Sequence, residues 1–287
     1  MAIVKQTTLR RATPIAMGIV TVACCLAGCA TATLTESGAL SSYAGLKPSD
    51  GVLTKTKVRV DQRAVLAARS ARLSPTIISD PATKSGLSAK QLQLVSNAID
   101  RALCRNLSSR FVIVEPGQDS DIVIQAIISH VSATDTIAAG ASVATNIGGT
   151  IASTVSGLPI PTVRIPLGMG SLSVEAEAKD QSGRQLAALV WARGADFLTT
   201  SARVAPEADA YTLASAFAAG LAELLVKGAD PITARTPSLP SAQAVGEFFG
   251  KSPKYGPCKQ FGAHPGLGDV LGGAIGLPPA WTDTGPK

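Results

Sequence analysis

The chain has few of the residues on which enzymes and nucleic-acid-binding proteins depend. Of 287 residues only two are histidines, His130 and His264, and no cysteine or histidine stands at metal-ligand spacing, which argues against a zinc site. Aromatic residues make up 4% and nowhere alternate with basic ones, so the sequence indicates no nucleic-acid partner. It also lacks a Gly-x-Ser-x-Gly turn, a Cys–His pair with an orienting acid and a phosphate-binding loop. We therefore expect no catalytic residue, no metal and no cofactor.

Acidic residues are absent from the first 28 positions, where Lys5, Arg10 and Arg11 precede an apolar run over 14–26. A basic start, a run too short to span a bilayer stably and small residues at its end are typical of a secretory signal. Removing it lowers the net charge from +6 to +3, because three basic residues leave with it. A charge this small on an exported chain again speaks against nucleic acid.

The signal ends in a motif, Leu26-Ala27-Gly28-Cys29, that resembles the bacterial lipobox. The resemblance implies that the Cys29 sulfur receives a diacylglyceryl group, that cleavage occurs before Cys29, and that acyl chains such as palmitate hold the protein to a membrane. The alternative is an ordinary secretory signal followed by an unmodified cysteine. Ala30 is not Asp, and by resemblance to proteobacterial sorting rules this favours the outer membrane, with the chain facing the periplasm.

Five cysteines reduce to two in the exported domain. Cys24 and Cys25 leave with the signal, and Cys29 is the lipidated residue, so Cys104 and Cys258 remain. The periplasm permits a disulfide between them, but spacing alone leaves the pairing open. Cys104 lies well off the centre of its helix's apolar stripe, and we expect it to be reachable from solvent.

Hydropathy patterns divide the mature chain into a lipidated tether (29–50), an α/β domain (51–230) and a Pro/Gly-rich tail (231–287). Within the tether, Leu40, Tyr43 and Leu46 are spaced by three, which allows a short docking turn. Nine prolines and ten glycines among the last 57 residues predict a disordered tail. The domain is predicted as a mixed sheet of about five strands with two long amphipathic helices on one face, in the order β-α-β-β-insert-β-β-α. The elements expected are strand 57–61, helix 88–110, strands 111–114 and 121–131, an insert over 136–163, strands 171–179 and 185–191, and helix 206–228.

Three of these elements carry the clearest signals. Ser88 and Gln91 form a capping box at the start of the first helix. Strand 171–179 alternates between an apolar face and a polar face that carries Glu175 and Glu177. A pair of carboxylates suggests acid–base chemistry, but at this spacing on a polar strand face they are expected to be solvated. His130 has no acid or nucleophile beside it in the sequence and is interpreted as structural.

The insert over 136–163 contains no charged residue. As a helix it would align small residues every four positions, with a row of β-branched residues beside them, which permits close packing. Three interpretations stay open: packing on its own domain, pairing with a second copy or another envelope protein, and insertion into the membrane. The small-residue stripe consists of Gly140, Ala144, Gly148, Ala152 and Ser156.

Four stretches follow one another in the mature chain: Ser37-Gly38-Ala39-Leu40-Ser41-Ser42-Tyr43-Ala44-Gly45-Leu46, Lys57-Val58-Arg59-Val60-Asp61, Ser120-Asp121-Ile122-Val123-Ile124-Gln125-Ala126, and residues 174–188 from Val174-Glu175-Ala176-Glu177 onward. In this order they resemble a bacterial lipoprotein family, the domain of unknown function 3313. The resemblance implies a class of protein and no established activity. From these observations we expect a non-catalytic module that is anchored to the outer membrane and binds an envelope protein or polymer. The alternative is a hydrolase acting on cell-wall or lipid material.

Overall fold

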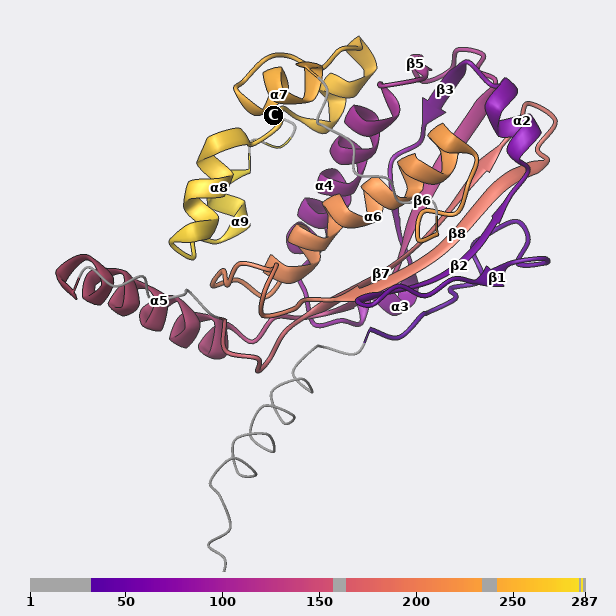
Figure 1. The fold of residues 1–287 in the computed structure, drawn as a ribbon. Coiled ribbons are helices and arrows are strands. Elements are labelled where there is room, and N and C mark those ends of the chain that lie inside the picture. Colours follow the sequence, from indigo (N-terminus) through magenta and orange to yellow (C-terminus); the bar gives the residue numbers. More distant parts are fainter. Residues whose placement is uncertain (1–31, 157–163, 234–241, 284, 286–287) are drawn as a thin grey trace, which may run out of the picture.

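The structure, a computed structural model, describes residues 32–156, 164–233, 242–283 and 285, and of residues 147–156 only the helical backbone. Within these residues one mixed eight-stranded sheet has two long helices, α4 and α6, side by side across one face (Figure 1). The strand order is β1-β2-β8-β7-β6-β3-β5, and β4 pairs with β6 beside this path. The prediction of about five strands was therefore too small.

The strands are β1 (Lys47–Pro48), β2 (Thr54–Val60), β3 (Ser70–Leu73), β4 (Ile77–Ile78), β5 (Val112–Ile113), β6 (Ile122–Ser132), β7 (Ser171–Lys179) and β8 (Gln185–Gly194). The helices of the domain are α2 (Gln62–Ala67), α3 (Asp80–Thr83), α4 (Ala89–Leu107), α5 (Thr136–Ser156) and α6 (Ala208–Lys227). Beyond them lie α7 (Ala242–Phe248), the 3₁₀ helix η1 (Gly256–Phe261), α8 (Gly266–Ala274) and α9 (Pro279–Thr282).

Every predicted element is present, and the strongest local signals are also correct in detail. The Ser88 side chain accepts from the Gln91 amide while the Gln91 side chain accepts from the Ser88 amide, so the capping box starts α4 as expected. Helix α6 ends at Gly228, whose φ of +62° is the left-handed conformation that glycine adopts without a steric penalty. Outside the C-terminal segment, the elements missing from the predicted order are β1, α2, β3, β4 and α3, all short segments between positions 47 and 83. Strands of two to four residues are too short to show a readable alternation.

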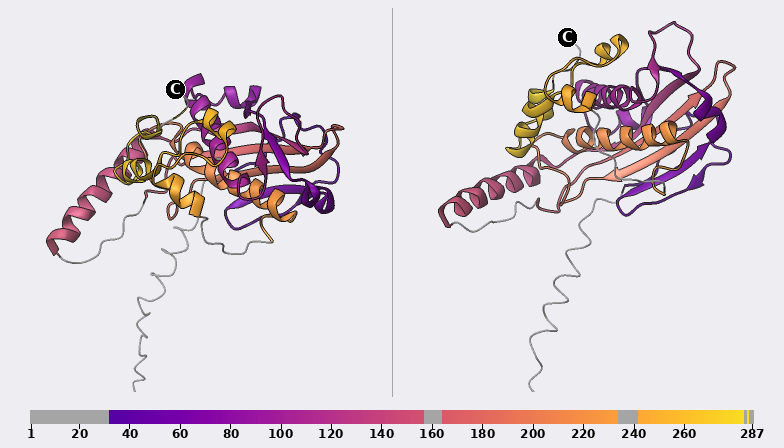
Figure 2. Two further views of the ribbon diagram at one scale, coloured as in Figure 1. Left: turned by 90° about the horizontal axis from the view of Figure 1, so that it is seen from above. Right: turned by 45° about the horizontal axis from the view of Figure 1, so that its top comes forward.

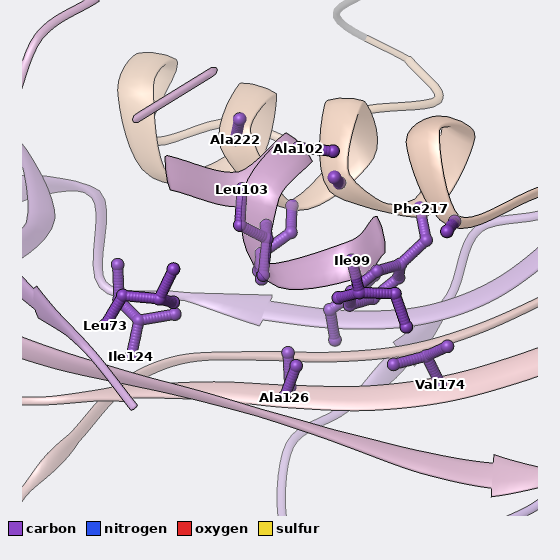
Figure 3. Close-up of a cluster of buried hydrophobic side chains, with 14 of the residues drawn as sticks. Leu73, Ile99, Ala102, Leu103, Ile124, Ala126, Val174, Phe217 and Ala222 are labelled. Atoms are coloured by element: carbon purple, nitrogen blue, oxygen red, sulfur yellow. The ribbon is translucent and has the colours of Figure 1, made fainter. Parts of the chain in front are cut away.

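The main core lies between the two helices and the face of the sheet beneath them, here called the helix face (Figure 3). Ile99 and Leu103 of α4 and Phe217 of α6 are fully buried there. Ile124 of β6 and Val174 of β7 meet them from the sheet. Each such side chain contributes about 1.5–3 kcal/mol when fully buried, so this layer is the main source of stability.

The C-terminal segment is not a disordered tail in the part that the structure describes. Residues 242–283 form helices α7 to α9, which stack beside α4 and α6 (Figure 2). Arg101 of α4 donates to both carboxylate oxygens of Asp283, at 3.2 and 2.5 Å, and Tyr211 of α6 donates to the same carboxylate at 2.7 Å. The prediction failed because glycine and proline content measures local backbone preference, whereas distant partners hold this segment.

Helix α5 extends away from the sheet (Figure 1). Its first turns meet the domain through Ala139 and Ser142, both buried, and Val143, which packs beside Gly276. Among the described residues one helix, α6, is long and apolar enough to cross a membrane, and it is largely buried as a core helix.

Candidate functional site

Glu175 and Glu177 do not face solvent, contrary to the prediction. Glu175 is 0% exposed and Glu177 is 3% exposed, although both point to the side of β7 opposite the helices. Residues 32–46, here called the strap, cover this side, which we call the strap face. The strap overlaps the segment expected as a tether, and it instead lies on the sheet over residues 34–46.

The Glu175 carboxylate accepts hydrogen bonds at both of its oxygens. Ser37 donates its backbone N–H to Oε1 at 3.1 Å and its hydroxyl to Oε2 at 2.5 Å. The Tyr43 hydroxyl donates to Oε1 at 2.9 Å. Burial, followed by the neighbouring Glu175 carboxylate, raises the pKa of Tyr43, so this hydroxyl keeps its proton and remains a donor.

The Glu177 carboxylate is bound in a similar way, by both the strap and its own hairpin. Ser41 donates its backbone N–H at 2.9 Å and its hydroxyl at 2.5 Å to Oε2, and Gln185 adds a third bond at 2.7 Å. The Lys179 ammonium lies 2.7 Å from Oε1. Burial by itself would raise the pKa of Glu177, but the bonds from Lys179, Ser41 and Gln185 outweigh it and hold this pKa below its usual value.

Apolar contacts complete the attachment of the strap. Leu40 is buried against Ile127, Ala188 and Val190 of the strap face. Leu34, Tyr43 and Leu46 pack around this cluster, so the docking turn expected from the spacing of Leu40, Tyr43 and Leu46 is present. The strap is therefore held by apolar burial and by charge-assisted hydrogen bonds, which are about twice as strong as neutral ones.

The strap runs alongside β7 in the same direction. Thr35 donates its N–H to Ser173 Oγ at 3.3 Å, Ser37 meets Glu175, and Ser41 meets Glu177. Ser173 in turn accepts from the hydroxyl of Ser129 on β6 at 3.0 Å. The chain therefore enters the sheet near the beginning of β7 and proceeds toward the β7–β8 turn.

His130 does not join the carboxylates. The contact that the structure gives for its ring is with Ser132 Oγ, at 3.3 Å. Among the described residues no three His, Cys, Asp or Glu side chains come close enough to hold a metal ion. What the structure does bring together is the set of stretches that resembled a family, because the strap, β2, β6 and the β7–β8 hairpin meet on one sheet.

Cys104 and Cys258 form a disulfide, with their Cα atoms 5.7 Å apart. The bond joins α4 to η1 across 154 positions of sequence. Cys104 is 0% exposed, so the expectation that solvent reaches it was wrong. The side of α4 away from its main stripe is covered by the C-terminal helices, which the helical pattern could not reveal.

The small-residue stripe of the insert is open where the structure describes it. A Cβ placed at Gly140 would have no heavy atom within 4 Å, and Ala144 is exposed. The side chains of Gly148, Ala152 and Ser156 lie outside the described residues. The described part of the stripe therefore makes no close contact with its own domain, and pairing with a second chain stays a prediction.

The predicted lipobox, Leu26-Ala27-Gly28-Cys29, also lies outside the described residues. Cys29 stands six residues before Thr35, the first strap residue hydrogen-bonded to the sheet. An extended chain spans at most about 3.5 Å per residue, so the Cys29 sulfur has to lie within about 20 Å of Thr35. This distance follows from the covalent chain alone.

The family described as Protein of unknown function (DUF3313) matches residues 35–221, a range that begins within the strap and ends within α6. No curated protein matches the sequence. Two crystal forms of the PelC dodecamer from Paraburkholderia phytofirmans are similar in structure, at 10% and 11% identity, with TM-scores of 0.34, covering 64% of this chain and 100% of theirs. A DUF4136 family protein from Bacteroides thetaiotaomicron is 10% identical with a TM-score of 0.29, over 59% of this chain and 96% of its own. TM-scores this low say nothing about the role of this chain.

Proposed function

The chain belongs to the family of proteins of unknown function DUF3313, and from this premise we propose that it is a lipid-anchored, non-catalytic module of the bacterial envelope. In this proposal Cys29 carries the lipid, the domain faces the periplasm from the outer membrane, and it acts by binding another envelope protein or polymer. The observation that carries the proposal is the attachment of the strap to the two buried carboxylates. A strap fixed in this way couples the position of the lipid to the orientation of the whole domain.

Export is supported by the disulfide. A buried bond between Cys104 and Cys258 is expected in an oxidising compartment such as the periplasm and is rare in the cytosol. It joins the family-matched domain to the C-terminal helices. The lipobox resemblance in the sequence and the disulfide in the structure are independent of each other, and both support a location outside the cytoplasm.

A non-catalytic role is supported by the use of the two carboxylates. Every oxygen of Glu175 and Glu177 accepts a hydrogen bond or an ion pair from the strap or the hairpin. Acid–base catalysis needs a carboxylate within hydrogen-bond reach of a substrate, and neither of these is open to one. The hydrolase alternative therefore has no observation in its favour among the described residues.

The anchor is tested by radiolabelled palmitate uptake and by the mass of the mature N-terminal peptide. We expect label on the wild type and on Cys25→Ser, a matched control in the signal, and none on Cys29→Ser. In a density gradient of separated membranes the wild type should follow the outer membrane, and Ala30→Asp should move toward the inner one. A mature N-terminus elsewhere than position 29, with product free in the periplasm or medium, would refute the anchor.

The binding role is tested by crosslinking the lipidated protein in intact cells, followed by purification under denaturing conditions. The expected result is a discrete adduct of defined mass with an envelope component. The control is Leu40→Ala, in which the strap is loosened while the lipid and the helix-face core remain. The same adduct in equal yield from both proteins would mean that the strap does not orient the domain for its partner.

A further inference from the structure

The register of the sheet brings the ends of four adjacent strands together at one end of the molecule. Ser132 of β6 pairs with Ser171 of β7, which pairs with Gly194 of β8, and Arg193 pairs with Thr54 of β2. The chain segments after β6, before β7, after β8 and before β2 therefore all leave from this row. We call it the row end of the sheet.

The chain beside each of these four strand ends carries a large apolar side chain in solvent. Val52 before β2 is 102% exposed, Ile137 after β6 is 84% exposed, Leu198 after β8 is 79% exposed, and Leu167 before β7 is 66% exposed. Scattered exposed apolar residues are normal on soluble proteins. Here four such side chains lie beside the ends of four adjacent strands, β2, β8, β7 and β6, and exposed apolar surface concentrated in this way marks an interaction site.

Four ionic groups at the row end are paired and withdrawn from solvent, whereas Asp50, Lys55 and Asp135 are exposed there. Arg164 and Asp209 form an ion pair at 2.5 Å with side chains 3% and 1% exposed. Arg193 pairs with Asp196 at 3.0 Å, with side chains 16% and 3% exposed. Asp135 is exposed, but its Oδ1 accepts from the first amides of α5.

The opposite end of the sheet carries more exposed charge, although Leu66 of α2 is 45% exposed there. The β7–β8 turn exposes residues 181–184, and the Arg184 side chain there is 61% exposed. Both ends are made of loops of the same sheet, so the difference lies in the side chains and not in the architecture. The two ends are therefore suited to different surroundings.

The strap leads the N-terminal chain to the row end. Thr35 is bonded to Ser173, the third residue of β7, and the strap runs from there toward the opposite end. The chain before Thr35 consequently leaves toward the row, and Cys29 is limited to about 20 Å from Thr35 by the length of six extended residues. The attachment point of the lipid and the four exposed apolar side chains thus share one end of the molecule.

We propose that the row end is a bilayer-contacting surface, in which Val52, Ile137, Leu167 and Leu198 enter the interface of the membrane that holds the Cys29 lipid. This inference rests on the proposed lipid anchoring. The occupant is a phospholipid surface because the covalent anchor keeps one within reach of these side chains, and because apolar groups at such an interface bind by burial in the headgroup and acyl boundary. The domain then stands with its strands rising from the membrane and its charged turn toward the periplasm.

The test uses the full lipidated protein in vesicles of phosphatidylethanolamine and phosphatidylglycerol, with or without lipids brominated on their acyl chains. The exposed Trp281 is first changed to Phe, which leaves Trp191, 3% exposed in the core, as a constant background. Leu167→Trp and Leu198→Trp report on the row end. Leu66→Trp is the matched control, because Leu66 is 45% exposed on α2 at the opposite end. These positions are exposed, so the substitutions leave the core intact.

Brominated lipid is expected to remove about half of the added fluorescence of Leu167→Trp and Leu198→Trp and none of that of Leu66→Trp, as for side chains within the acyl boundary. Vesicle-bound protein without quenching at the row end, or with equal quenching at both ends, overturns the inference. The emission of the introduced tryptophan could instead shift to the blue as protein concentration rises, without quenching by brominated lipid. That result would mean that a second copy of the chain covers the row end, and it would also overturn the inference. Protein that does not float with the vesicles at all refutes the lipid anchor instead, so the two failures are distinguishable.

Discussion

Tyr43→Phe removes one oxygen atom from the strap and provides a sharp test of how the strap is held. The Tyr43 hydroxyl donates to Glu175 at 2.9 Å and accepts the Leu40 N–H at 3.3 Å. The ring stays, so the apolar packing around Leu40 is retained. The change therefore isolates the polar contribution of a single side chain.

The expected cost follows from these two contacts. A hydrogen bond to a charged group contributes about 1.5–3 kcal/mol to stability. Tyr43 is only half-buried, and Ser37 still donates to both oxygens of Glu175, so the lower part of this range applies. We expect the free energy of strap opening to fall by about 1.5 kcal/mol, which is roughly a tenfold change in the opening equilibrium.

Amide hydrogen exchange measures this opening directly. The Ser37 and Ser41 amides both donate to the buried carboxylates, so they exchange only when the strap lifts. Both should exchange about tenfold faster in Tyr43→Phe, while amides in the middle of β7 keep their protection. Tyr255→Phe is the matched control, because the Tyr255 hydroxyl has no hydrogen bond among the described residues. Unchanged Ser37 exchange, or equal changes in both variants, would mean that the carboxylates do not hold the strap.

Four further predictions concern the rest of the fold. Cys258→Ser should lower the free energy of unfolding by about 2–4 kcal/mol and expose residues 242–283 to protease, and a reductant should then lower the melting temperature of the wild type alone. Burial raises the pKa of Asp100 from 3.8 to about 7, against the hydrogen bonds from Thr76, so the folded state keeps a proton that the unfolded state has lost. The stability that this group contributes therefore falls as pH rises from about 4 to about 7. In urea unfolding, the free energy of unfolding should decrease between pH 5 and pH 8 by less in Asp100→Asn than in the wild type, and an identical decrease in both would contradict this. Asp209→Ala leaves Arg164 buried without its anion and should lower the free energy of unfolding, measured by chemical denaturation, by about 3–5 kcal/mol. Arg184→Ala, at an exposed pair, should lower it by under about 1 kcal/mol, and equal losses in the two variants would be inconsistent with the burial of the first pair. Gly140→Leu should leave the melting temperature unchanged or higher, since no heavy atom lies within 4 Å of the added Cβ, and light scattering then reports whether the exposed stripe pairs two chains.

Local patterns were sufficient for the elements that carry their own signals. The capping box at Ser88, the alternation of strand 171–179 and the glycine end of α6 each depend on residues within one turn or one hairpin. Their hydrophobic faces also had to be buried, and so the helix face of the sheet could be expected before the structure was known. The sheet's full width could not, because β3 and β4 are too short to show a pattern.

Long-range contacts decided what the same patterns left undefined. A polar strand face looks identical whether water or another segment covers it, and the strap that covers Glu175 lies 138 positions away at Ser37. The C-terminal helices are likewise held by Cys104 and Arg101, more than 150 positions before their partners. The predicted signal and lipobox need no tertiary structure to be proposed, because motifs of this kind are recognised in an unfolded chain, one residue after another. The burial of a carboxylate depends on which surface closes over it, and only the complete tertiary fold determines that surface.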